Sequence, residues 1–342
     1  MTERPGSDAG RQVGASGHQG SASGQQGSGA GQQGAAPVPR QHAFRCADAA
    51  RERSDGISGT APRGTYWVLV EHRGGWPVNG FDGLDLDPDV YAEVFAAAQA
   101  LRARILLIRR HGRRSRAASG HWGVMHLAGP GDLRQIWGRW RHDADLLGIS
   151  EALREVAEPP AVRTVEQPVI LVCAHAQHDL CCAIRGRPVA AALATRWPEQ
   201  VWECSHVGGD RFAANVLMVP DGVYYGNLEA DSAVQVIEEH LADRIGAEHL
   251  RGYTDLAPVE QVAVAAALEH WGPAGRFDHR IDSAAFEDGR WGVQVRRTPT
   301  EQVLQVELTA SRTVPHQLTC RGPQKAMAVT FTVESVTACS TM

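Results

Sequence analysis

The sequence predicts an α/β protein with an antiparallel β segment towards its C-terminal end. Three observations lead to this prediction. Short apolar strands alternate with amphipathic helices between about residue 65 and residue 244. Three later stretches alternate apolar and polar residues with the period of two that is typical of half-buried strands. The chain has 342 residues, of which 43% are hydrophobic, so it can build a sizeable core without disulfide bonds.

Composition excludes several classes of protein. The formal net charge is −5, and a nucleic-acid-binding protein would instead require a basic patch. The sequence contains no run of about 18 apolar residues, so we expect no membrane span. It begins without the apolar segment of a secretory signal, and the cysteine count of seven is odd. We therefore expect a cytoplasmic protein, in which clustered cysteines are more often metal ligands or catalytic groups than disulfides.

The N-terminal half divides into a tail and a first α/β region. Residues 1–43 are predicted to be a disordered tail, because they are rich in Gly, Ser and Gln and cannot bury enough apolar surface to order themselves. Residues 44–160 are predicted to form an N-terminal α/β region. The elements expected there are a strand over 65–72, a helix over 87–101, strands over 104–109 and 121–127, and a helix over 132–140.

A second unit is predicted over residues 165–255, after the boundary marked by Pro159 and Pro160. The elements expected there are a strand over 169–172, a helix over 182–195, strands over 200–203, 215–219 and 223–225, and a helix over 232–244. Strand, helix, strand, hairpin and closing helix is the order of a thioredoxin-like domain. The region 256–342 is predicted to add a helix over 258–270 and antiparallel strands over 291–296, 303–308 and 328–333.

The residues that could carry chemistry lie in two loops, each of which follows a predicted strand. The first loop runs from Cys173 to Cys182 and the second from Cys204 to Asp210. Strand ends hold ligands rigidly while loops let them converge, so cysteines and histidines in these places favour a metal site. Soft thiolates suit zinc or iron–sulfur, and mixed thiolate–imidazole ligation occurs in iron–sulfur proteins. Eight residues separate Cys173 from Cys182, which argues against a compact zinc knuckle.

The residues next to these ligands have competing interpretations. Cys181 and Cys182 are adjacent, and because adjacent residues rarely both reach one metal, one of them is expected to be a small buried side chain. Asp179 is expected to cap the following helix. His175 and His178 are either donors behind the ligands or solvated loop residues. Structural or incidental roles are expected for Cys46, Cys320 and Cys339.

Several motifs in the right order resemble the sucrase/ferredoxin-like family. They are the C-x-H-x-x-x-D-x-x-C stretch from Cys173, the Gly-Arg-Pro of 186–188, the phrase His-Val-Gly-Gly-Asp-Arg-Phe-Ala-Ala-Asn of 206–215, and the turn of 220–226. The resemblance is densest over about residues 165–255 and weaker over 46–76, and it also touches Leu250-Arg-Gly252 and Leu318-Thr-Cys320. Members of this family carry a thioredoxin-like [2Fe–2S] ferredoxin domain. The resemblance therefore implies an electron-transfer protein with a [2Fe–2S] cluster and a redox partner protein of unknown identity.

The resemblance also implies a ligand set. Fungal members bind the cluster through two cysteines and through two histidines in an H-x-G-G-H phrase. By position, Cys173 and Cys182 match the cysteines, and His206 matches the first histidine. The sequence departs from the pattern at the last ligand, where it has Asp210. A carboxylate would add negative charge to the cluster and should lower its potential.

Three points stay open at the level of the sequence. The fourth ligand is Asp210, Cys204 or Cys181, and the departure from the pattern also allows that no complete cluster forms. The alternative functions are a metal-free thiol redox protein that uses Cys181 and Cys182, which lack the usual C-x-x-C spacing, and a binding module with a degenerate site. Whether the protein is an enzyme is open, but sucrase activity is not supported, because no pair of carboxylates stands out.

Overall fold

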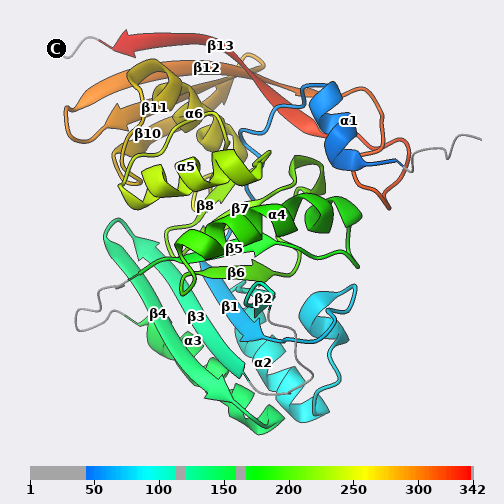
Figure 1. The fold of residues 1–342 in the computed structure, drawn as a ribbon. Helices are drawn as coiled ribbons and strands as arrows, with labels where there is room; N and C mark the ends of the chain where they lie inside the picture. Colours follow the sequence, from blue (N-terminus) through cyan, green and yellow to red (C-terminus); the bar gives the residue numbers. More distant parts are fainter. Residues whose placement is uncertain (1–43, 113–119, 159–166, 340–342) are drawn as a thin grey trace, which may run out of the picture. The chain divides into compact units, whose positions relative to one another are not determined.

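The computed structural model describes residues 44–112, 120–158 and 167–339, and Figure 1 shows its fold. The predicted tail and the predicted boundary at Pro159 and Pro160 lie outside the described residues. The helices are α1 (Cys46–Glu52), α2 (Pro88–Ala100), α3 (Gly148–Ala157), α4 (Leu180–Arg196), α5 (Ala230–Leu241) and α6 (Pro258–Trp271), with short 3-10 helices η1 (Gly80–Gly83), η2 (Asp143–Leu147) and η3 (Asp210–Phe212). The strands are β1 (Tyr66–Glu71), β2 (Arg104–Arg109), β3 (Gly120–Gly129), β4 (Asp132–Trp140), β5 (Val169–Cys173), β6 (Val201–Cys204), β7 (Val216–Val219), β8 (Val223–Tyr225), β9 (Leu250–Tyr253), β10 (His279–Glu287), β11 (Arg290–Arg297), β12 (Gln302–Arg312) and β13 (Val329–Cys339).

Nine strands form one mixed sheet in the order β4-β3-β1-β2-β6-β5-β7-β8-β9. Strands β1 and β2 are parallel, as are β5 and β6, whereas β7 and β8 run antiparallel to their neighbours. A second, antiparallel sheet has the order β10-β11-β12-β13. The fold class predicted from the sequence, α/β with an antiparallel β segment towards the C-terminus, is confirmed.

The large sheet draws strands from both predicted α/β regions. Its β4-β3-β1-β2 part comes from residues before 159, and its other part begins with β6. Strands β2 and β6 join the two parts through the antiparallel register pairs Ile108 with Cys204 and Arg109 with Glu203, and Leu107 and Ser205 exchange two further hydrogen bonds beside them. Arg109 and Glu203 also form a buried ion pair, with 2.8 Å between nitrogen and oxygen. A short seam with a buried ion pair therefore lies directly beside the strand that ends at Cys204.

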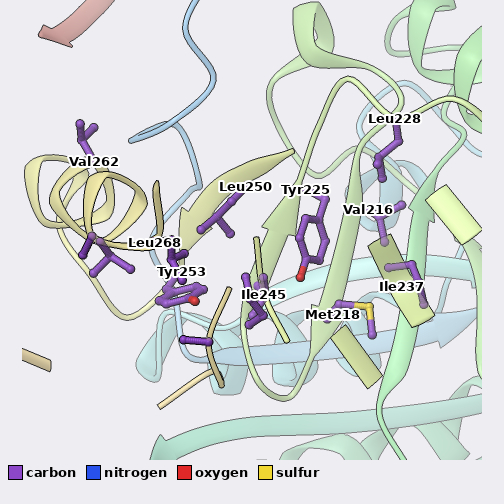
Figure 2. Close-up of a cluster of buried hydrophobic side chains, with 14 of the residues drawn as sticks. Val216, Met218, Tyr225, Leu228, Ile237, Ile245, Leu250, Tyr253, Val262 and Leu268 are labelled. Carbon is purple, nitrogen blue, oxygen red and sulfur yellow. The ribbon is translucent and has the colours of Figure 1, made fainter. Parts of the chain in front are cut away.

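The helices bury the apolar faces of the sheet. Helices α2 and α3 pack through Val94 and Leu153 against Val68 of β1 and the strands beside it. Helices α4, α5 and α6 share a larger apolar cluster with β5, β7 and β8, and with the inner face of the second sheet. Figure 2 shows part of this cluster, in which Val216 and Met218 of β7 lie near Ile237 of α5. The central strands are thus held between apolar layers.

The predicted helix over 132–140 is wrong, because this segment is strand β4. Leu133, Ile136 and Trp140 have helical spacing, but residues 132–140 pair with β3 along almost their whole length. Gly131 adopts a φ of 73° in the turn between the two strands, a conformation that glycine allows at little cost. Arg134 is buried and donates to the backbone oxygens of Val156 and Glu158. Tertiary pairing therefore overrides the local apolar pattern.

The other expected helices and strands are confirmed to within three residues of their predicted ends, except that β12 and β13 run four and six residues beyond the predicted ends at 308 and 333. The sequence did not predict α1, α3, β9 or β10. Strand β10 is missed because almost all of its side chains are at least partly exposed, so it has no clear alternation of apolar and polar residues. The domain boundaries of the sequence analysis stay predictions.

A buried histidine lies where the second sheet meets α6. The imidazole of His279 stacks on the indole of Trp271, with parallel rings whose centroids are 5.6 Å apart. Within the described part of the chain, neither ring nitrogen of His279 has a hydrogen-bond partner. Burial, with the nearby charge of Arg297, lowers the pKa of His279 from 6.5 to about 4. The folded protein therefore holds this imidazole neutral.

This histidine should make the protein sensitive to mild acid. The unfolded chain binds a proton at His279 more tightly than the folded protein does. The free energy of unfolding is therefore unaffected by this histidine above about pH 6.5 and falls as the pH drops towards 4. The variant His279→Phe keeps an aromatic ring on Trp271 but has no group to protonate. When the pH falls from about 7 to about 5, we expect the free energy of unfolding of the wild type to drop by about 1–2 kcal/mol more than that of the variant. Urea unfolding at both pH values measures this. His270→Phe is the control, because His270 is exposed and should respond to acid as the wild type does. Equal drops in the free energy of unfolding of the wild type and His279→Phe would contradict the prediction.

Candidate metal-binding site

Strand β5 and helix α4 place the two predicted cysteine ligands. All five residues of β5 are buried, and Cys173 ends the strand beside Cys204 of β6. Helix α4 begins after Asp179, whose carboxylate accepts a hydrogen bond from the backbone N–H of Cys181 at 2.8 Å. The predicted cap is therefore confirmed, and it fixes where the first turn of α4 begins. Cys182 lies in that turn, and both it and Cys173 are 1% exposed.

Gly186 lets α4 approach the end of β5 closely. A Cβ atom at this position would lie 2.0 Å from the carbonyl oxygen of Cys173, a distance that no side chain tolerates. The helix backbone therefore packs directly on the strand end, which brings the first turn of α4 over Cys173. The Gly-Arg-Pro motif of the sequence has its physical role in this contact.

The loop after β6 carries the other two candidate ligands, His206 and Asp210. Gly208 and Gly209 have φ values of 93° and 80°, so the backbone turns sharply between the two ligands. Arg251 of β9 lies beneath this turn, and a Cβ atom on Gly209 would lie 2.4 Å from its guanidinium. The guanidinium donates to the backbone oxygen of Gly208 and to the side-chain oxygen of Asn215, each at 2.9 Å. A fully buried arginine thus holds the loop in place.

The four predicted ligands converge. The ligand atoms of Cys173, Cys182 and His206 lie within 4.8 Å of one another. The Cys182 thiol donates to Asp210 Oδ1 at 3.1 Å, and His206 Nδ1 lies 2.9 Å from the same oxygen. The direction of that second contact is not that of a hydrogen bond, so His206 Nδ1 is buried without a hydrogen-bond partner among the described residues. Two thiols on one side and an imidazole with a carboxylate on the other form a donor set that fits a metal centre.

Two further histidines surround His206. The ring of His178 stacks on that of His206, with 3.7 Å between centroids, and His178 Nδ1 or Nε2 lies within 4.8 Å of the His206 and Asp210 ligand atoms. His175 is buried, donates from Nε2 to the backbone oxygen of Pro77 at 2.8 Å and accepts at Nδ1 from the backbone N–H of His206 at 3.2 Å. Burial lowers the pKa of His175, which fits this neutral form. His175 therefore orients the loop, and His178 is a further potential ligand.

Neighbouring groups and burial shift the pKa values of all four predicted ligands. The Cys182 thiol and the His206 imidazole act against burial and hold the pKa of Cys173 well below its ordinary value. Burial disfavours the charged form of His206, but Asp210 and Cys173 outweigh it and raise the pKa of His206 to about 9. Burial also opposes ionisation of Asp210, yet His206 lowers its pKa. Cys173 and burial raise the pKa of Cys182. A thiolate, an imidazolium and a carboxylate thus lie together, with one thiol that a metal would have to ionise.

Neither of the two alternative cysteines joins the ligand atoms of this site. Cys204 is fully buried beside Cys173, in the apolar cluster that also contains Cys182, and burial raises the pKa of its thiol. It is not part of any group of close ligand atoms among the described residues. Cys181 points to a different cluster, which contains Cys46, Asp179 and Cys320. A hydrogen bond from the Cys46 thiol lowers the pKa of Cys181 to about 7 despite burial.

Sequence reasoning missed some of the residues that shape this region. Arg251 comes from β9, a strand that the sequence does not predict; the family resemblance touches Leu250-Arg-Gly252 but gives Arg251 no role. For Cys46 and Cys320, which are 274 residues apart in the chain, the sequence predicts only structural or incidental roles. Only their side-by-side placement in the fold, which no local pattern encodes, brings them to Cys181.

The fold and the site together define an α/β protein with a buried thiolate–imidazole–carboxylate group that could hold a metal. The sucrase/ferredoxin-like family model matches residues 58–252, more than half of the chain. The protein therefore belongs to the sucrase/ferredoxin-like family. No match was found among curated proteins or among solved structures. In the part of the chain that the structure describes, no helix has the length and apolar character needed to cross a bilayer.

Proposed function

We propose that this protein holds a [2Fe–2S] cluster and transfers single electrons to and from a redox partner protein. The observation that carries the proposal is the convergence of two thiols, an imidazole and a carboxylate. The ligand atoms of Cys173, Cys182 and His206 lie within 4.8 Å of one another, and Asp210 Oδ1 contacts both Cys182 and His206. A two-iron centre requires two protein ligands on each iron, and mixed cysteine–histidine ligation of this kind is known. When bound, the cluster supplies one-electron redox chemistry.

The surrounding residues have separate tasks in this proposal. Asp179 and Gly186 fix the first turn of α4 over the end of β5 and so bring Cys182 to Cys173. His175 orients the backbone of His206, and Arg251 holds the Gly-Gly turn between His206 and Asp210. These contacts are made by groups that are not ligands themselves, as is usual behind metal ligands.

We also propose that the central part of the molecule is a thioredoxin-like domain. Its strand order is β6-β5-β7-β8, with β5 and β6 parallel, β7 antiparallel to β5, and β8 antiparallel to β7. Helix α4 connects the two parallel strands, and α5 follows the hairpin. This order and these directions support the assignment made from the sequence.

An open cavity of about 450 Å³ beside the site offers a place for the partner. Its lining includes Arg187, together with Arg73 and Arg109, whose guanidinium groups are paired with Glu71 and Glu203. Trp76 and His175 also line it, with Arg109 4.0 Å above the Trp76 ring and His175 edge-on to that ring. Since His175 accepts from the backbone of His206, the cavity wall contacts the ligand loop directly.

The test is the iron and sulfide content of the full chain, purified anaerobically and reconstituted. We expect about two irons and two sulfides per chain, with the visible absorption of a cluster, and loss of both in Cys182→Ser. Cys339→Ser is the matched control, because Cys339 is exposed at the end of β13. A colourless, iron-free wild-type protein after reconstitution would overturn the proposal.

The same preparations separate the alternative functions. A metal-free thiol redox protein would show rapid alkylation of one cysteine and no bound iron. A binding module with a degenerate site would keep its stability and partner binding in Cys182→Ser. The divergence of Cys181 and Cys182 into different clusters disfavours the first of these. All cysteines are free, which is compatible with the reducing cytoplasm that we propose as the protein's location.

A further inference from the structure

A second group of potential metal ligands lies behind the first turn of α4. It consists of Cys46 at the start of α1, Asp179 and Cys181 at the start of α4, and Cys320 in the segment between β12 and β13. Their ligand atoms lie within 4.8 Å of one another; Cys320 is half-buried and the other three residues are buried. Figure 1 shows α1 in blue beside the orange segment that leads into β13. Three distant parts of the chain thus meet at one point.

The distances within this group are those of ligands around a single ion. Cys320 Sγ lies 3.5 Å from Cys181 Sγ and 3.6 Å from Cys46 Sγ. Cys46 Sγ lies 3.7 and 3.6 Å from the two oxygens of Asp179. In a tetrahedral zinc site with Zn–S bonds of about 2.3 Å, sulfurs are ~3.8 Å apart and a sulfur lies ~3.5 Å from a carboxylate oxygen. The observed spacings agree with these values to a few tenths of an ångström.

The carboxylate is already oriented for this role. Asp179 Oδ1 accepts from the backbone N–H of Cys181, and Oδ2 accepts from the backbone N–H of Cys320, each at 2.8 Å. Each oxygen keeps a further lone pair, and backbone donors of this kind commonly fix the direction of metal-ligating carboxylates. The backbone N–H of Cys46 donates to Cys320 Sγ at 3.5 Å, which likewise holds that sulfur in the group.

Other chemistries fit the group less well. A disulfide would use two of the three sulfurs and leave the third thiol and a carboxylate buried beside it. Three thiolates and one carboxylate also exclude magnesium and calcium, which prefer oxygen ligands.

We propose that Cys46, Asp179, Cys181 and Cys320 bind one zinc ion. With four protein ligands the site is closed, so its role is structural. The ion would tie α1 and the β12–β13 segment to the first turn of α4. Cys182 directly follows the zinc ligand Cys181 in that turn. The two sites share no ligand, because the side chains of Cys181 and Cys182 lie in separate apolar clusters.

The experiment measures zinc and iron separately in the full chain, produced with both metals supplied. We expect about one zinc per chain in the wild type and in Cys339→Ser, and at least a tenfold lower zinc content in Cys320→Ser with iron retained. Cys182→Ser should show the opposite pattern, with zinc retained and iron lost. Failure of the zinc site is thus distinguishable from failure of the iron centre.

Cobalt binding to the wild-type protein provides a second measurement that does not depend on a variant that folds. Cobalt(II) in place of zinc should give the visible absorption of tetrahedral thiolate ligation, and Cys339→Ser should give the same spectrum. Wild-type protein that binds neither zinc nor cobalt would overturn the proposal, as would zinc content unchanged in Cys320→Ser. A disulfide between Cys181 and Cys320 in protein purified without oxidant would overturn it as well.

Discussion

Replacing Arg251 with methionine is expected to lower the free energy of unfolding by about 3 kcal/mol or more. The side chain of Arg251 is among the largest that are fully buried, and burial lowers the pKa of its guanidinium to about 10. It donates to the backbone and hydroxyl oxygens of Thr60, the backbone oxygen of Gly208 and the side chain of Asn215. Methionine fills similar space but leaves these buried acceptors without donors, and each such loss costs about 1–3 kcal/mol.

Urea unfolding measures this effect. Arg196→Met is the matched control, because Arg196 is 61% exposed and its ion pair with Glu238 lies on the surface. Exposed pairs contribute roughly 0–1 kcal/mol, so this control should remain close to the wild type. Equal stability of the two variants would contradict the prediction. Since Arg251 also holds the turn at Gly208 and Gly209, we expect Arg251→Met to retain less iron than the wild type at equal protein concentration.

Replacing Asp210 with histidine is expected to raise the midpoint potential of the reconstituted protein by ~100 mV or more. The substitution restores the H-x-G-G-H phrase of the fungal relatives and removes one negative charge from the ligand set. Asp210 is buried and its oxygen contacts both Cys182 and His206, so its charge acts at short range with little screening. A neutral imidazole in this position would repel the added electron less than the carboxylate does. The reduced state would therefore be more stable and the potential higher.

A potentiometric titration followed by visible absorption measures the shift. Asp231→His is the control, because Asp231 is exposed in the first turn of α5 and should leave the potential unchanged. An unchanged potential in Asp210→His would show that Asp210 is not a ligand. In that case loss of iron in Cys204→Ser would identify Cys204 as the fourth ligand instead.

Much of the candidate site could be predicted from the sequence because its information is local. Cys173 follows a short apolar strand, Asp179 caps a helix, and two glycines separate His206 from Asp210, so each feature is visible within about ten residues. The structure brings these segments together as expected.

The remainder depends on contacts between distant parts of the chain. The segment 132–140 was taken for a helix, because its apolar spacing does not reveal that β3 pairs with it. Cys46 and Cys320 have no neighbours in sequence that suggest a ligand group. Arg251 resembles any other arginine until the fold places it under the turn at Gly209. Burial and pairing of this kind are properties of the whole fold, not of a sequence window.

The narrow seam between β2 and β6 limits how the ligand-bearing segment could be inherited or exchanged between proteins. Residues 165–255 carry all four proposed iron ligands, yet β6 within them has its outer neighbour, β2, in the preceding region. Removed from that region, β6 would become a free edge, and Glu203 would lose the guanidinium of Arg109. Recombination that moved this segment alone would therefore pass on the ligands without the strand that protects them. The cofactor-binding residues and their structural support are transmissible only as a larger piece of chain.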